Sequence, residues 1–141
     1  GSKDAIAAAA TAAKELGIKR AIPLATAGGF HSPFMAPARE KLAPVLDGIT
    51  FNAPKFPVLS NVTGKPHASD PGAIKAMMLE QVTGTTNWAA DVEAAKALGC
   101  TTFVEFGPGK VLSGLIKKID ATLTTANVSD QASLEAALAV V

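Results

Sequence analysis

The sequence is poor in the residues that build disulfide scaffolds: Cys100 is the only cysteine among 141 residues. One cysteine excludes an internal disulfide framework, and its place before an apolar run predicts a small buried side chain in a reducing compartment. No apolar run approaches the roughly 20 residues that a membrane-spanning helix needs. The charged residues near the start are unlike a signal peptide. We therefore expect a soluble, intracellular protein.

A charge excess of either sign is also missing. Thirteen basic residues face twelve acidic ones, which leaves a formal net charge of +1, and the two signs are interspersed. This pattern lacks the basic patch that nucleic-acid-binding domains need. Apolar residues make up 48% of the chain, which is typical of a folded domain rather than a disordered one.

Helical and strand patterns alternate along the chain. Helices are predicted over 2–16, 33–46, 74–82, 88–98, 110–119 and from 131 onward. Strands are predicted over 20–24, 56–60, 101–106 and 122–128. This alternation predicts an α/β fold with a mostly parallel sheet.

Several local signals bound these elements. Ser2, Asn87 and Asp130 are expected to cap the helices that follow them, and Gly17 to end the first helix. Pro44 should end or kink the second helix, because proline has no N–H for the helical ladder.

His31 is the strongest candidate for chemistry. It follows the loop Gly28-Gly29-Phe30 and precedes Ser32-Pro33, the predicted start of a helix. An imidazole at such a site can act as an acid or base, although a surface or capping histidine is the alternative interpretation. His67 lies in a predicted turn, where a structural role is expected.

Four motifs in order carry a family resemblance. They are Gly28-Gly29-Phe30-His31-Ser32-Pro33-Phe34-Met35, the stretch Pro57–Gly64 after Phe51–Pro54, Gln81 seven residues before Trp88, and Glu105–Leu112. Together they resemble the malonyl-CoA:acyl carrier protein transacylases, and they are equally similar to the acyltransferase domains of fatty acid and polyketide synthases. The resemblance covers nearly the whole chain.

The resemblance implies roles for two catalytic residues. His31 would be the general base that activates a serine nucleophile and later protonates the thiolate of coenzyme A. The main-chain oxygen of Gln81 would accept a hydrogen bond from Nδ1–H of His31, in place of the carboxylate that orients the histidine of a Ser-His-Asp triad. An ordinary residue at a helix end is the alternative interpretation of Gln81.

Two further residues are candidates for substrate binding. Phe30 stands just before the histidine, where the resemblance implies selection of malonyl over methylmalonyl groups by steric exclusion, an effect of about 1–3 kcal/mol. Phe30 could instead anchor the loop. Asn61 could hydrogen-bond within the site or close a turn after its strand.

The segment Gly107-Pro108-Gly109-Lys110 joins a predicted strand to a predicted helix. A strand, a glycine turn and a helix N-terminus can form an anion site. The segment lacks the glycine spacing and the hydroxyl residue of a nucleotide P-loop. Close packing of the helix on the strand is the favoured interpretation.

The resemblance also implies the architecture. Residues 1–26 would be the last helix and strand of a ferredoxin-like small subdomain, and residues 27–141 the C-terminal part of an α/β-hydrolase-like core. None of the seven serines stands in the Gly-x-Ser-x-Gly context that presents the nucleophile. We therefore expect a C-terminal portion that is inactive and unstable without a complementary N-terminal chain.

The implied partners are malonyl-CoA, an acyl carrier protein and that N-terminal chain, with no nucleic acid and no membrane. No metal site and no cofactor beyond the coenzyme A thioester substrate is implied. The implied location is cytoplasmic, or a plastid or mitochondrion in a eukaryote. The alternative function is a non-catalytic module that docks a carrier protein or a partner chain.

Overall fold

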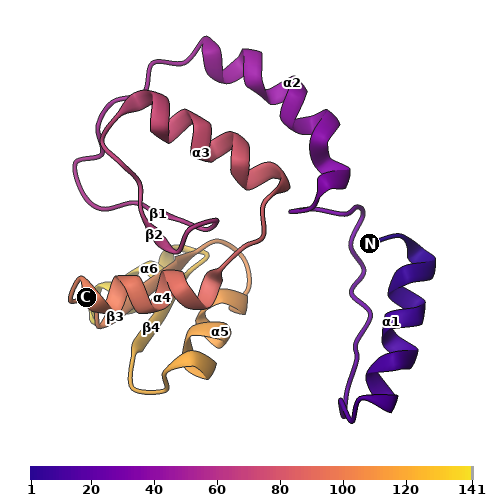
Figure 1. Ribbon diagram of the computed structural model, residues 1–141. Coiled ribbons are helices and arrows are strands. Elements are labelled where there is room, and N and C mark those ends of the chain that lie inside the picture. The colour runs from indigo at the N-terminus through magenta and orange to yellow at the C-terminus, as the bar shows by residue number, and fades with distance from the viewer. Residues whose placement is uncertain (141) are drawn as a thin grey trace. The chain divides into compact units, whose positions relative to one another are not determined.

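The computed structural model describes residues 1–140, and the chain divides into two compact units (Figure 1). The helical unit comprises Gly1–Ala53 and Ser69–Thr86. The sheet unit comprises Pro54–Ala68 and the chain from Asn87 onward. Helices and strands both occur, so the prediction of an α/β chain is confirmed. No helix within residues 1–140 is long and apolar enough to cross a membrane.

The helical unit begins with α1, Lys3–Glu15. The Ser2 side chain accepts a hydrogen bond from the amide of Ala5, which confirms the predicted N-cap. Gly17 adopts a left-handed φ of 74° just after the helix, a conformation that glycine reaches without a side-chain clash. Local sequence therefore determines both ends of α1.

The predicted strand over 20–24 is wrong. The structure shows no regular secondary structure there, and within residues 1–140 this segment has no partner strand. A strand persists only where its N–H and C=O groups find partners, and Pro23 has no N–H to offer. An apolar run alone was therefore insufficient evidence for a strand.

The second predicted helix is two elements, the 3-10 turn η1, Pro33–Met35, and the helix α2, Ala36–Asp47. Pro44 does not end this helix, which continues for three more residues. Leu46 within those residues is buried, and its burial offsets the hydrogen bond that Pro44 cannot donate. Of the two predicted effects of Pro44, the stop is therefore wrong, and the kink stays a prediction.

The third helix of this unit, α3, spans Pro71–Thr83 and lies beside α2 (Figure 1). Asp70 caps it by accepting a hydrogen bond of 2.7 Å from the amide of Ala73. Lys75, near the start of α3, pairs with Asp47 at the end of α2. The two helices are thus antiparallel neighbours.

The sheet unit opens with a short antiparallel hairpin of β1, Leu59–Ser60, and β2, Lys65–Pro66. The predicted strand over 56–60 was too long, because Pro57 cannot donate to a strand ladder. Gly64 has a left-handed φ of 63°, and a Cβ added there would lie 2.4 Å from Cβ of Ala90. Only glycine allows this close approach to α4, Trp88–Ala97.

A parallel pair forms the larger sheet of this unit. The strands β3, Thr102–Phe106, and β4, Thr124–Val128, pair in register and are joined by α5, Val111–Ile119. The helix α6, Gln131–Leu138, follows, and Asp130 and Ser133 form a capping box at its start. This is a β-α-β arrangement, as the alternation of patterns predicts. The core consists of Val92, Ile116 and Leu123, with Trp88, Phe103 and Ile119 packed against it.

Two further predictions fail in this unit. Asn87 precedes α4, but its side chain makes no capping hydrogen bond and donates to the main-chain oxygen of Val62 instead. Cys100 is exposed rather than buried. It lies in the connection before β3, where its amide bonds to Ala95 and its thiol faces outward.

Candidate functional site

The loop before η1 presents His31. The Ser32 hydroxyl donates to the main-chain oxygen of Gly29 at 2.5 Å and accepts from the amide of Phe34 at 3.3 Å. The first bond spans Phe30 and His31, and the second fixes the start of η1 just after them. A Cβ on Gly29 would lie 3.1 Å from Oγ of Ser32 and 3.2 Å from the ring of Phe34. The bare glycine therefore lets the loop close.

His31 is the only non-glycine residue within 1–140 with a positive φ, at 56°. The left-handed region is unfavourable for a residue with a Cβ, although histidine enters it more readily than most. Such outliers persist where the surroundings over-determine them, and they concentrate at functional sites. The closed Ser32 turn supplies that constraint here.

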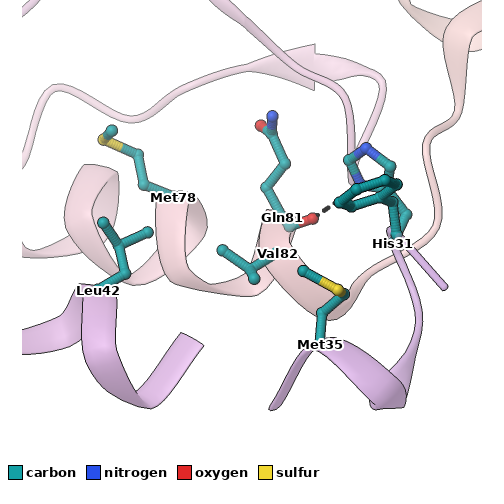
Figure 2. A pocket seen from close by; sticks show the side chains of 7 residues that line it. His31, Met35, Leu42, Met78, Gln81 and Val82 are labelled. Carbon is teal, nitrogen blue, oxygen red and sulfur yellow. Dashed lines mark hydrogen bonds between the residues drawn. The ribbon is translucent and has the colours of Figure 1, made fainter. Parts of the chain in front are cut away.

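The imidazole of His31 contacts the end of α3. Its Nδ1 lies 2.9 Å from the main-chain oxygen of Gln81, 50 positions further along the chain (Figure 2). A carbonyl oxygen can only accept, so Nδ1 must carry the proton. In the neutral ring, Nε2 is then left as the unprotonated nitrogen. The contact thus selects the tautomer whose Nε2 can take a proton from a substrate or nucleophile.

The electrostatic setting of the ring is neutral. Within residues 1–140 no carboxylate forms an ion pair with His31. The Glu80 carboxylate beside Gln81 is paired with Arg39 at 3.1 Å instead. A neutral acceptor orients the imidazole but stabilises its protonated form less than a carboxylate would.

A mainly apolar cavity of about 330 Å³ lies beside the ring (Figure 2). It is lined by Phe30, His31, Met35, Leu42, Met78, Gln81 and Val82. A concave, apolar site with few polar groups is the usual form of a small-molecule site. The flexible side chains of Met35 and Met78 can adapt to ligands of different shape.

The structure therefore brings three of the four predicted site residues together. Phe30, His31 and Gln81 line one cavity of the helical unit, and Phe30 is 57% exposed. Asn61 belongs to the sheet unit, in the turn between β1 and β2, where its main-chain oxygen accepts from the amide of Asn87 at 2.6 Å. The functional roles of all four residues stay predictions.

The lining residues Leu42, Met78 and Val82 were missed by sequence reasoning. Met78 and Val82 are four positions apart, and so share the face of α3 that also carries Gln81. That spacing was the available signal. Nothing in the sequence showed that α2 supplies the opposite wall through Leu42.

The second histidine, His67, belongs to the β1–β2 hairpin and does not line the cavity beside His31. The amide of His67 bonds to the main-chain oxygen of Val58 and extends the β1–β2 hairpin. No group of three potential metal ligands occurs within residues 1–140. His31 lines the apolar cavity described above, and His67 does not.

The turn after β3 has a structural explanation. The Glu105 carboxylate accepts from the amides of Leu112 and Ser113 at 3.1 and 2.8 Å and from the Ser113 hydroxyl at 2.7 Å. These bonds, above all those from Ser113, hold the pKa of Glu105 below its usual value. The carboxylate thus occupies the N-terminus of α5, where it takes up these two amides in place of an external anion.

Known proteins resemble this chain closely. It is 42% identical to the malonyl CoA-acyl carrier protein transacylase of Bacillus subtilis over 138 residues, which are 98% of this chain and 43% of that protein. It is 41% identical to the Escherichia coli K12 protein of the same name, over 98% of this chain and 44% of the other. No protein-family model matches the chain.

Solved structures agree with the sequence matches. The acyl-carrier-protein S-malonyltransferase of Burkholderia pseudomallei 1710b superposes with a TM-score of 0.89 at 43% identity, over 97% of this chain and 44% of that one. A malonyl-transacylase in complex with its type II PKS acyl-carrier protein superposes with a TM-score of 0.91 at 42% identity. That match covers 99% of this chain and 45% of the other.

The chain spans less than half the length of the relatives it matches. Both its sequence and its fold follow those relatives almost from end to end, and the missing length fits a C-terminal portion. In sequence and in fold alike, nearly the whole chain is therefore similar to one part of the malonyl-CoA:acyl carrier protein transacylases.

Proposed function

We propose that this chain is the C-terminal part of an enzyme that moves malonyl from coenzyme A to the phosphopantetheine thiol of an acyl carrier protein. The observation that carries the proposal is the 2.9 Å contact between Nδ1 of His31 and the oxygen of Gln81. It leaves Nε2 as a base in a cavity, which is what nucleophilic acyl transfer requires of a histidine.

In the proposed reaction His31 moves one proton back and forth. Nε2 takes the proton of a serine hydroxyl as the serine oxygen attacks the thioester carbonyl. The C–S bond then breaks, and Nε2 returns the proton to the departing coenzyme A sulfur. A second cycle takes the proton of the carrier thiol, which attacks the serine ester, and returns it to the serine oxygen.

The other candidates act on the substrate in this proposal. Phe30 lines the cavity and would exclude an acyl group with an added methyl, at about 1–3 kcal/mol. Asn61 would make a polar contact with the substrate. The architectural proposal is that residues 1–26 end a ferredoxin-like subdomain and that later residues belong to an α/β-hydrolase-like core.

The surface of the chain supports a complementary N-terminal portion. In the sheet unit, β3 and β4 pair only with each other within residues 1–140, so each has an open edge. Phe106 at the end of β3 is 75% exposed, and Val111 at the start of α5 is 70% exposed. Large exposed apolar side chains beside open strand edges are typical of an interface.

A function without catalysis is the second candidate. It is favoured by one observation: none of the serines in this chain stands in the elbow context of a nucleophile. In that case the chain would dock a carrier protein or partner chain. The proposed cytoplasmic location applies to either function.

Intact mass spectrometry with malonyl-CoA tests the proposal. The chain is combined with the N-terminal portion of the same protein, and the mass of each polypeptide is measured before and after malonyl-CoA is added. We expect one malonyl group on the N-terminal portion and none on this chain. Adding an acyl carrier protein should then transfer the group to its thiol.

Variants of the two histidines give the matched control. His31→Ala should reduce malonyl transfer by about 10²- to 10⁴-fold, the usual contribution of a general base. His67→Ala should leave it unchanged, since that residue lines neither cavity that the structure defines. Transfer that survives His31→Ala, or the absence of any malonyl adduct, would favour the docking function instead.

A further inference from the structure

Arg39 joins the two helices that meet at the candidate site. Its Nη2 lies 3.1 Å from a carboxylate oxygen of Glu80, and its Nη1 lies 3.4 Å from the Thr83 hydroxyl. Arg39 is on α2, and both partners are on the last turn of α3. The guanidinium therefore spans from one helix to two positions on the other.

The two positions flank Gln81. Glu80 precedes it directly, and Thr83 follows two residues later, so the guanidinium is held on both sides of the residue whose oxygen accepts from His31. His31 itself stands eight residues before Arg39. Arg39 thus ties the helix that follows His31 to the helical turn that carries its hydrogen-bond acceptor.

The contact between His31 and Gln81 depends on the register of the two helices. One residue of slip along a helix is a rise of about 1.5 Å, which would lengthen a 2.9 Å contact beyond hydrogen-bond range. The opposite end of the helix pair is joined by Lys75 and Asp47. Arg39 is therefore the cross-link nearest the ring, and Lys75 provides an equivalent link far from it.

The chemistry of arginine suits this geometry. Its planar group offers N–H donors on different nitrogens in a fixed arrangement, whereas lysine offers a single point charge. The side chains of Arg39 and Glu80 are 42% and 48% exposed, and ion pairs at such positions contribute little to overall stability. The pair is better suited to setting a local geometry than to stabilising the fold.

We propose that Arg39 is a positioning residue, which fixes the end of α3 so that the Gln81 oxygen holds Nδ1–H of His31. The inference rests on the proposed function, because a fixed tautomer matters only if His31 moves protons. It assigns Arg39 no contact with substrate. Its effect passes through Gln81 to the imidazole.

The test compares Arg39→Ala, Arg39→Lys and Lys75→Ala in the complete enzyme, this chain together with its N-terminal portion. Nitrogen-15 NMR of the His31 imidazole reports the fraction of the ring with its proton on Nδ1. We expect Arg39→Ala to give a mixture of tautomers and Lys75→Ala to keep the original one. Arg39→Lys should restore the Nδ1–H form only in part.

Kinetics provides the second readout. In Arg39→Ala we expect kcat to fall by about 10- to 100-fold with KM nearly unchanged, the scale of a misplacement of about 1 Å. Lys75→Ala should retain kcat. Unchanged imidazole spectra in Arg39→Ala, or an equal loss of kcat in Lys75→Ala, would overturn the inference.

The two proposals fail in distinguishable ways. If the unaltered protein transfers no malonyl group, the proposed function fails, while the imidazole spectra still show whether Arg39 sets the tautomer. If transfer occurs and the tautomer is insensitive to Arg39, only the positioning role fails. Thermal melting of each variant separates a local change from unfolding, because a positioning role predicts an unchanged melting temperature.

Discussion

Different interactions predominate inside the helical unit and inside the sheet unit. The sheet unit buries Val92, Ile116 and Leu123 in one core beneath a parallel strand pair. The helical unit buries few apolar side chains, and its cross-helix links include the ion pairs of Arg39 and Lys75. Regions with few buried contacts open at low free energy. The candidate site thus lies in the unit with less burial, where polar contacts set its geometry.

The largest expected effect is on the core of the sheet unit. Ile116→Ala removes buried methyl groups from a side chain that is 3% exposed, so unfolding should become easier by about 2–5 kcal/mol. Trp88 is the only tryptophan and belongs to this unit, so its fluorescence during urea unfolding reports the change. The matched control, Val45→Ala on the exposed face of α2, should shift stability by less than about 0.5 kcal/mol. Equal losses of stability in Ile116→Ala and Val45→Ala would contradict the view that the buried core stabilises the sheet unit.

A buried acid should make the sheet unit sensitive to pH. Asp91 on α4 is 4% exposed, and neither carboxylate oxygen has a hydrogen-bond partner within residues 1–140. Burial raises the pKa of Asp91. The folded state then keeps a proton that the unfolded state has lost, so stability falls as pH rises from the ordinary aspartate pKa through the raised one. Asp91→Asn should remove this slope and stabilise the protein at pH 7 by about 1–3 kcal/mol.

Asp120 gives a control of opposite sign. Hydrogen bonds from Thr122 and the Lys96 ammonium, 2.9 Å away, lower the pKa of Asp120. Its stabilisation is therefore present above the ordinary pKa and is lost as pH falls toward the lowered one. Urea unfolding between pH 3 and 7 gives the free energy of unfolding as a function of pH. Asp120→Asn and Asp91→Asn should change the slope of that curve in opposite directions. The same change in both variants would show that Asp91 is not a buried, uncompensated acid.

The smallest expected effect lies in the helical unit. Ser32→Ala removes the hydroxyl that links Gly29 to Phe34, at a cost of about 1 kcal/mol to the turn that presents His31. Hydrogen exchange of the Phe34 amide should accelerate, while Trp88 fluorescence keeps its urea midpoint. Ser69→Ala, at an exposed position before α3, is the control and should change neither. A shift in the Trp88 midpoint would mean that the two units unfold together.

Much of the secondary structure could be predicted from local chemistry. Ser2 and Asp130 cap their helices through side-chain oxygens, and the β-branched run before Gly107 forms β3. These signals act within a few residues, so they need no knowledge of the fold. The predictions of secondary structure failed where residues distant in the sequence determine whether an element forms. The segment over 20–24 lacks a partner strand, and the burial of Leu46 carries α2 past Pro44.

The site divides in the same way. Its position at His31 followed from the glycine loop and the helix start, and the part played by Gln81 came from the resemblance rather than from spacing. The contacts of Arg39 with Glu80 and Thr83 could not be predicted, because these partners lie more than 40 positions away along the chain. No local pattern records which carboxylate a surface arginine will meet. The exposure of Cys100 was likewise decided by the turn that precedes β3.

The sequence by itself determined the caps of α1 and α6, the α/β alternation and the histidine loop, because these depend on backbone preferences and on hydrogen bonds between near neighbours. Tertiary structure alone decided the tautomer of His31, the burial of Asp91 and the link from Arg39 to the end of α3. Each of these depends on side chains brought together from distant positions. Their energies arise from desolvation and from contacts across helices, which exist only after the chain has folded.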